Sequence, residues 1–147
     1  YWAIAFTGTL PPGIARFVHN TLGWSTRITA WIASMRDEYP ACALEQSDYP
    51  AAVVITEPTL DRSRGLAVTG ILWGIKGILL FPHMIVLQIL GFVAGIAGWI
   101  AYWAIAFTGV YPDGIFNFVL GTLRWSVRMN AWLFSLTDAY PPFTLNE

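Results

Sequence analysis

Residues 77–112 read GILLFPHMIVLQILGFVAGIAGWIAYWAIAFTGVYP, and no Lys, Arg, Asp or Glu interrupts this run of 36 residues. A helix of about 20 apolar residues is long enough to cross the hydrocarbon core of a bilayer. The run therefore predicts one spanning helix at residues 84–107, and its aromatic side chains Tyr102, Trp103 and Phe107 are expected at one membrane–water interface.

The composition of the whole chain agrees with this prediction. Hydrophobic residues make up 56% of the sequence and charged residues 12%, whereas about 25% of the residues of a typical soluble domain are charged. We therefore predict an all-α integral membrane protein.

The last part of the uncharged run is spelled twice. The octet YWAIAFTG stands at residues 102–109 and again at residues 1–8, and residues 1–44 and 102–145 share 25 of 44 identities without a gap. We predict two homologous repeats, at residues 1–44 and 66–147, joined by a polar linker at residues 45–65. The first repeat lacks a counterpart of residues 51–100, so we expect the sequence to begin inside that repeat, truncated at its N-terminus.

Glycines recur before and within the predicted spanning helix. Residues 66–81 are apolar but short, and they precede Pro82, so we predict a half-crossing, re-entrant or tilted interfacial helix that ends there. Steps of three and four residues place small side chains on one helix face, where two backbones can approach closely. We predict helix packing through two such sets, which are Gly70, Gly74 and Gly77, and Gly91, Gly95 and Gly98.

A second helix is predicted in each repeat, at residues 14–35 and 115–136, and each carries a basic stripe. The arginines are Arg16 and Arg27 in the first helix and Arg124 and Arg128 in the second. An arginine in the middle of a bilayer costs at least about 2.5 kcal/mol, so we expect an amphipathic helix in the interface plane, or one that pairs its arginines with a partner. We predict lipid or partner binding by these arginines; a solvated cationic face is the alternative interpretation.

The linker contains a β-branched run, VVIT at residues 53–56, between Pro50 and Pro58. This run predicts a short β-strand within the polar loop. A single strand is not stable alone, so it would have to pair with another copy or with a partner.

Motifs of known enzyme chemistry are missing from the sequence. There is no phosphate-binding loop, no G-x-S-x-G and no cluster of metal ligands, and the single Cys42 forms no redox pair. His83 could ligate a haem or a chlorin, but a histidine at a helix start in the interface is the favoured interpretation. Asp37 and Asp138 are expected to pair with local arginines or to cap turns. We therefore predict no catalytic residue, no metal and no cofactor.

The second repeat resembles a known family. Its motifs are Pro82-His83, Phe107-Thr108-Gly109, Tyr111-Pro112, Leu123-Arg124-Trp125-Ser126 and Thr137-Asp138-x-Tyr140-Pro141-Pro142-Phe143. Together they resemble the membrane family called domain of unknown function 4389, over residues 63–145. The first repeat departs from the pattern, with Gly23 in place of the arginine and Ala41-Cys42 in place of Pro-Phe. The resemblance implies tandem copies of the unit in a prokaryotic plasma-membrane protein, and it implies no activity.

Two functions remain open at this point. The favoured one is a non-catalytic accessory or scaffold subunit of a larger prokaryotic plasma-membrane complex, multi-pass, with other membrane-protein subunits and membrane lipids as partners and no nucleic acid. The alternative is a lipid-binding or lipid-transport component that holds anionic headgroups with its paired basic stripes.

Overall fold

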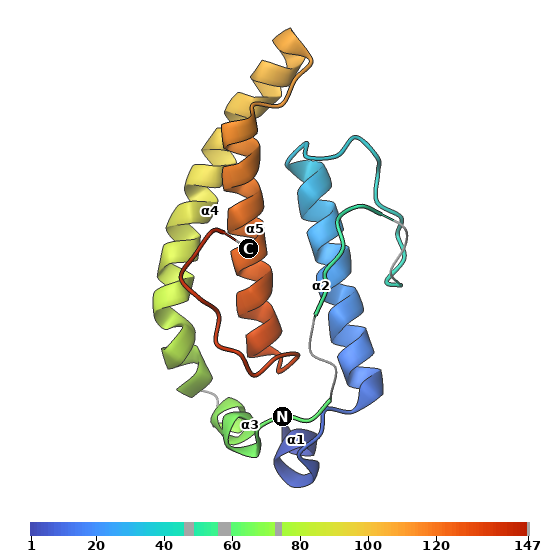
Figure 1. Ribbon diagram of the computed structural model, residues 1–147, viewed down its shortest axis with the longest axis vertical. Helices are drawn as coiled ribbons and strands as arrows, with labels where there is room; N and C mark the ends of the chain where they lie inside the picture. The colour runs from blue at the N-terminus through green and yellow to red at the C-terminus, as the bar shows by residue number, and fades with distance from the viewer. Residues whose placement is uncertain (46–48, 56–59, 73–74, 147) are drawn as a thin grey trace.

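The computed structural model describes residues 1–45, 49–55, 60–72 and 75–146, and the regular secondary structure in these ranges is helical. The helices are α1 (Trp2–Thr7), α2 (Pro12–Ile32), α3 (Arg64–Ile71), α4 (Ile75–Thr108) and α5 (Asp113–Leu133). Figure 1 shows α4 and α5 side by side, with α1 and α3 together at one end of the molecule. The all-α prediction is thus confirmed for the described residues.

Of the helices in the described ranges, α4 alone is long and apolar enough to cross a membrane. At about 1.5 Å per residue its 34 residues extend over about 51 Å, more than the roughly 30 Å of a hydrocarbon core. Only 11% of its most apolar window is buried inside the protein, so most of its side chains face outward. The length and the exposed apolar surface of α4 support membrane association.

Pro82 lies inside α4, so the prediction that a helix ends at this residue is wrong. The break falls earlier, after α3, which ends at Ile71. A proline inside a helix removes one backbone donor and crowds the carbonyl four residues before it. The hydroxyl of Tyr140 donates to the carbonyl of Leu79 over 2.7 Å, next to Ile78, the residue four positions before the proline. Contacts with the chain that follows α5 thus support α4 close to the proline.

Helix α5 runs antiparallel beside α4, as Figure 1 shows. The residues that α4 buries are Lys76, Leu80, His83, Ala94, Gly98 and Ala101. They recur mainly at steps of three and four, which place them along one side of the helix. A helix lying in the interface plane would cross a spanning helix, whereas α5 follows α4 along its length. If α4 crosses a bilayer, this arrangement places α5 along it and not in the interface plane, so the interfacial orientation of α5 stays a prediction.

Helices α2 and α5 have the same length, 21 residues, and their boundaries are offset by 101 positions. Each follows a turn that contains a glycine in the left-handed region, with φ of 78° at Gly8 and 70° at Gly109. Each is followed by a serine with positive φ, 53° at Ser34 and 58° at Ser135. We call residues 101 positions apart equivalent. The backbone around these two helices follows the same path at equivalent residues.

The predicted β-strand is not formed by the described residues of the linker. Residues 53–55 have no regular secondary structure, and Thr56 lies outside the described residues. The carbonyl of Val53 contacts the His19 ring nitrogen at 2.9 Å instead of a neighbouring strand. Within the described ranges an isolated antiparallel bridge does form further along, between Thr9 and Asp61. β-branched residues alone do not make a strand when no partner backbone lies beside them.

Candidate functional site

Two buried cationic side chains hold the C-terminal end of α5. The ammonium of Lys76 donates to the carbonyl of Trp132 at 3.1 Å and to the hydroxyl of Ser135 at 3.0 Å. The guanidinium of Arg62 donates to the carbonyl of Ser135 at 3.0 Å and to that of Leu136 at 2.6 Å. The last carbonyls of a helix lack intrahelical donors and carry partial negative charge. Lys76 contacts a carbonyl of the last turn and Arg62 contacts the carbonyls of Ser135 and Leu136 just after the helix, so the two cations fix the end of α5 against the chain before it.

Aromatic rings complete the surroundings of Lys76. Its nitrogen lies 4.8 Å from the ring centre of Tyr1 and 4.7 Å from that of Trp132. Such cation–π contacts favour the charged ammonium when water is excluded. The single lysine within the apolar part of the chain is therefore paired with the protein and not with lipid.

The tyrosines of the two octets make equivalent contacts across the molecule. The hydroxyl of Tyr1 donates to the carbonyl of Leu133 at the end of α5. The hydroxyl of Tyr102 donates to the carbonyl of Ile32 at the end of α2. The first octet thus contacts the end of α5, the helix that follows the second octet, and the second octet contacts the end of α2, the helix that follows the first.

Arg27 and Arg128 hold the chain that follows their own helices. Arg27 is 2% exposed, and it donates to the carbonyls of Ala43 at 2.7 Å and Glu45 at 3.4 Å. Arg128 donates to the equivalent carbonyls of Thr144 and Asn146. These two predicted binding residues therefore use their guanidinium groups on backbone within the protein.

The other two predicted arginines, Arg16 and Arg124, are exposed. Arg124 lines a cavity of about 790 Å³ between α2, α5 and residues 50–54, together with Arg36 and Arg128. Apolar side chains from both helices form much of the rest of the wall, and none of the described residues that line it is acidic. The structure thus brings Arg124 and Arg128 to one cavity and leaves Arg16 and Arg27 outside it.

The predicted glycine sets do not pack against each other. Gly70 lies against the ring of Tyr1, whose nearest atom would be 2.6 Å from an added Cβ, and Gly74 lies outside the described residues. At Gly77, Gly91, Gly95 and Gly98 an added Cβ would meet no atom within 4 Å. The second set therefore borders open space, in contrast to the predicted close approach of two helices.

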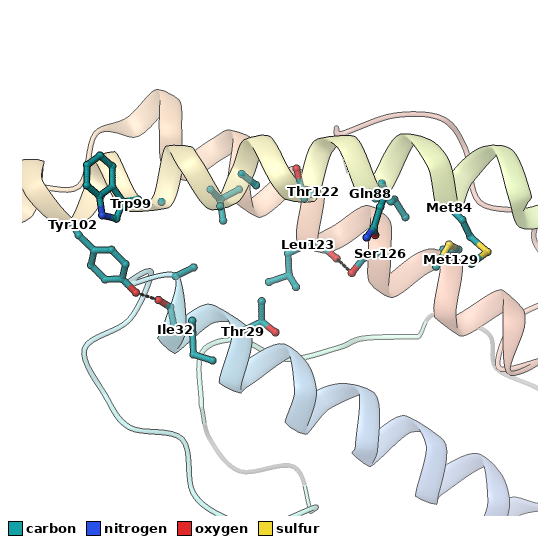
Figure 2. A pocket seen from close by; sticks show the side chains of 17 residues that line it. Thr29, Ile32, Met84, Gln88, Trp99, Tyr102, Thr122, Leu123, Ser126 and Met129 are labelled. Atoms are coloured by element: carbon teal, nitrogen blue, oxygen red, sulfur yellow. Dashed lines mark hydrogen bonds between the residues drawn. The ribbon is translucent and has the colours of Figure 1, made fainter.

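That open space is a groove of about 690 Å³ between α2, α4 and α5, which we call the glycine groove. Figure 2 shows Trp99 and Tyr102 near one end and Met84 and Met129 near the other. The remaining lining includes Gly91, Gly95, Gly98, Gln88, Thr29, Thr122 and Ser126. The walls are mainly apolar, with a few hydroxyl and amide groups, so the groove suits an apolar occupant.

His83 lies inside α4, fully buried among aromatic rings of α5 and of the chain that follows α5, so it is not the helix-start residue that the sequence suggested. Its Nδ1 accepts from the indole N–H of Trp125 at 3.0 Å, and its ring stacks on Phe143 with centroids 3.7 Å apart. An indole can only donate, so the proton of a neutral His83 resides on Nε2. Within the described residues no group of three or more His, Cys, Asp or Glu could hold a metal ion.

Sequence reasoning missed the two cations that cap α5. Arg62 lies in the predicted polar linker, yet it is only 8% exposed. Lys76 lies in the predicted short helix of residues 66–81, and it is only 2% exposed. One signal was present for Lys76. An ionisable residue inside an apolar helix usually faces the interior of a bundle and pairs there.

The close contact at Gly121 gives a test of where the C-terminal tail, residues 134–146, lies. An added Cβ at Gly121 would lie 2.7 Å from the carbonyl oxygen of Leu145, which is backbone and cannot swing away. We expect Gly121→Ala to release the tail and to lower the free energy of unfolding by about 1–3 kcal/mol. Amide hydrogen exchange of residues 143–146 would measure the release. Gly95→Ala, where the methyl group meets open space, is the control, and equal protection of the tail in both variants would contradict the expectation.

The described residues form a helical protein with one candidate membrane-spanning helix, in which buried cations and tyrosine hydroxyls contact helix ends. Residues 72–144 match the model of the family described as domain of unknown function (DUF4389), which supports the resemblance of this part of the chain to that family. The matched range includes α4, α5 and most of the tail. Comparison with curated proteins gave no match, and comparison with solved structures gave none.

Proposed function

We propose that the protein is a non-catalytic accessory or scaffold subunit of a larger membrane complex, and that the glycine groove receives a transmembrane helix of a partner subunit. The carrying observation is that Gly91, Gly95 and Gly98 line a groove of about 690 Å³ that no side chain of the described residues fills. Steps of four and three along α4 put these small residues on one side of the helix. Association of helices in lipid depends on close packing at such positions.

The repeat supports this role. We infer that residues 1–44 are a second copy of the part of the family unit at residues 102–145, and that residues 45–65 are a linker. The 25 of 44 identities support the inference, as do the equivalent bounds of α2 and α5 and the equivalent bonds of Arg27 and Arg128. Tandem units of this kind would cross the bilayer more than once. A multi-pass location in a prokaryotic plasma membrane follows from the family resemblance.

The test is photo-crosslinking from the groove in the native membrane. A crosslinking residue at Gly95 is expected to capture one membrane protein in stoichiometric yield, and the same residue at Gly77 is not. Gly77 is the matched control because it lies on the same helix, also borders open space, and does not line the groove.

A blocking variant extends this test. Gly95→Leu is expected to reduce recovery of the same partner after purification in mild detergent about tenfold or more, because the side chain would occupy the groove, whereas Gly77→Leu retains it. Crosslinking to lipid alone, or equal recovery of the partner with both variants, would overturn the proposal.

Lipid handling is the second candidate, and the cavity with Arg36, Arg124 and Arg128 favours it. Guanidinium groups beside an apolar wall match an anionic headgroup and its acyl chain. Against it, Arg128 already donates to two backbone carbonyls. Anionic lipid that remains bound to a purified protein lacking protein partners would favour this candidate over the scaffold.

A further inference from the structure

An extended stretch of the chain, residues 60–63, is held between the turn after α1 and the turn after α5. The backbone N–H of Arg62 donates to the carbonyl of Gly8, and the N–H of Leu10 donates to the carbonyl of Leu60, both over 2.8 Å. This is the pairing of an antiparallel bridge, with Thr9 opposite Asp61. We call the place that residues 60–63 occupy the filled slot.

Side chains and the end of α5 form the opposite wall of the filled slot. The guanidinium of Arg62 donates to the carbonyls of Ser135 and Leu136. The backbone N–H of Ser63 donates to a carboxylate oxygen of Asp138 over 2.7 Å. The filled slot thus recognises three features of its occupant, which are an extended backbone, an arginine and the N–H of the residue after it.

Equivalent residues surround a cavity of about 330 Å³ at the other end of the molecule. We call it the open slot. Its lining includes Ile105, Gly109, Tyr111, Ser34, Met35 and Asp37, which are equivalent to Ile4, Gly8, Leu10, Ser135, Leu136 and Asp138. The glycine and serine of each slot share the same positive φ values, within 8° for the glycines and 5° for the serines (78° and 70°; 53° and 58°). The open slot therefore presents the same backbone groups and the same carboxylate.

We propose that the open slot binds an extended, arginine-bearing polypeptide segment, in the way that the filled slot holds residues 60–63. The carbonyl of Gly109 and the N–H of Tyr111 would pair with the backbone of the segment. The carbonyls of Ser34 and Met35 would accept from its arginine, and Asp37 would accept from the N–H of the following residue.

Charge in the open slot agrees with a cationic occupant. Asp37 and Glu38 face it together with Arg36, so the lining carries one net negative charge. Arg36 and Glu38 replace the Thr137 and Ala139 of the filled slot, so they add a pair of opposite sign without changing this balance. The open slot is separate from the glycine groove, since the two share no lining residue. The proposal therefore does not depend on what occupies the groove.

The test uses the whole chain in detergent micelles and a fluorescent peptide with the sequence of residues 60–66, LDRSRGL. We expect saturable binding below about 1 mM by fluorescence anisotropy. The peptide LDQSRGL should bind about tenfold more weakly, because it lacks the guanidinium that pairs with the helix end. Asp37→Asn in the protein should weaken binding of LDRSRGL by a similar factor, and Asp138→Asn should not.

A crosslinking arm locates the bound peptide independently of these variants. A photoreactive group on the peptide is expected to label Met35 or Tyr111, as mapped by mass spectrometry. Four results would each overturn the proposal: no saturation up to about 1 mM, equal binding of the two peptides, unchanged binding by a folded Asp37→Asn variant, or labels confined to the end of α5.

Discussion

Replacing Arg62 with alanine is expected to lower the free energy of unfolding by about 3 kcal/mol. The guanidinium is 8% exposed and donates to the carbonyls of Ser135 and Leu136. A hydrogen bond with a charged partner contributes about 1.5–3 kcal/mol, and a buried acceptor left without a donor adds its own desolvation cost. The loss should appear as a lower midpoint in thermal or denaturant unfolding followed by circular dichroism in detergent.

Arg64→Ala is the matched control for this variant. Arg64 is exposed two residues further on, and the bond it is shown to make is a long one, 3.4 Å to the carbonyl of Thr7. The two variants remove the same charge from the same segment, so a general attraction between linker and membrane predicts similar losses. We expect the Arg64 variant to change stability by less than about 1 kcal/mol. Equal destabilisation by both variants would show that Arg62 does not fasten α5.

The largest topological effect is expected at the two ends of α5. Helix α5 lies antiparallel along α4, so if α4 crosses the bilayer, the two ends of α5 should lie on opposite sides of it. In a Cys42→Ser background, cysteines at Asp113 and Ala139 should then react with a membrane-impermeant maleimide from opposite sides. Both positions are exposed and lie just at the start and just beyond the end of the helix.

Labelling in intact and in opened vesicles separates the possible outcomes. Reaction of one cysteine in intact vesicles and of the other only after permeabilisation would agree with the hairpin of α4 and α5. Reaction of both from one side would show that α5 does not follow α4 across the membrane, and would restore the interfacial helix. Denatured protein, in which both cysteines must react, controls for reagent access.

The class of the protein and the main helices were predictable because they depend on local signals. The uncharged run of residues 77–112 predicted a long apolar helix, and α4 contains the predicted residues 84–107. The glycine and proline turns placed the starts of α2 and α5 within two residues of the predicted positions, 14 and 115. Periodicity and turn chemistry act over a few residues, so a single sequence carries them.

The site was less predictable because it depends on contacts between distant segments. Arg62 and Lys76 meet the end of α5, 56 to 74 positions further along the chain. No local pattern distinguishes a buried arginine of this kind from a solvated one. The prediction of a strand was wrong for the same reason. Residues 53–55 have the composition of a strand, but no described backbone segment pairs with them. The prediction of a helix end at Pro82 was wrong for a different reason. The preference of proline to end a helix is local, whereas α4 continues through Pro82 and contacts Tyr140 there.

The exchange of tyrosine contacts between the octets ties the folding of one half of the chain to that of the other. Tyr1 is bonded to the carbonyl of Leu133, and Tyr102 to that of Ile32, so the last turn of each of α2 and α5 receives one hydrogen bond from the other half of the chain. Unfolding of either half would strip a donor from the other. The protein should therefore unfold in one cooperative transition. Substitution of Tyr1 should loosen the end of α5, and substitution of Tyr102 should loosen the end of α2.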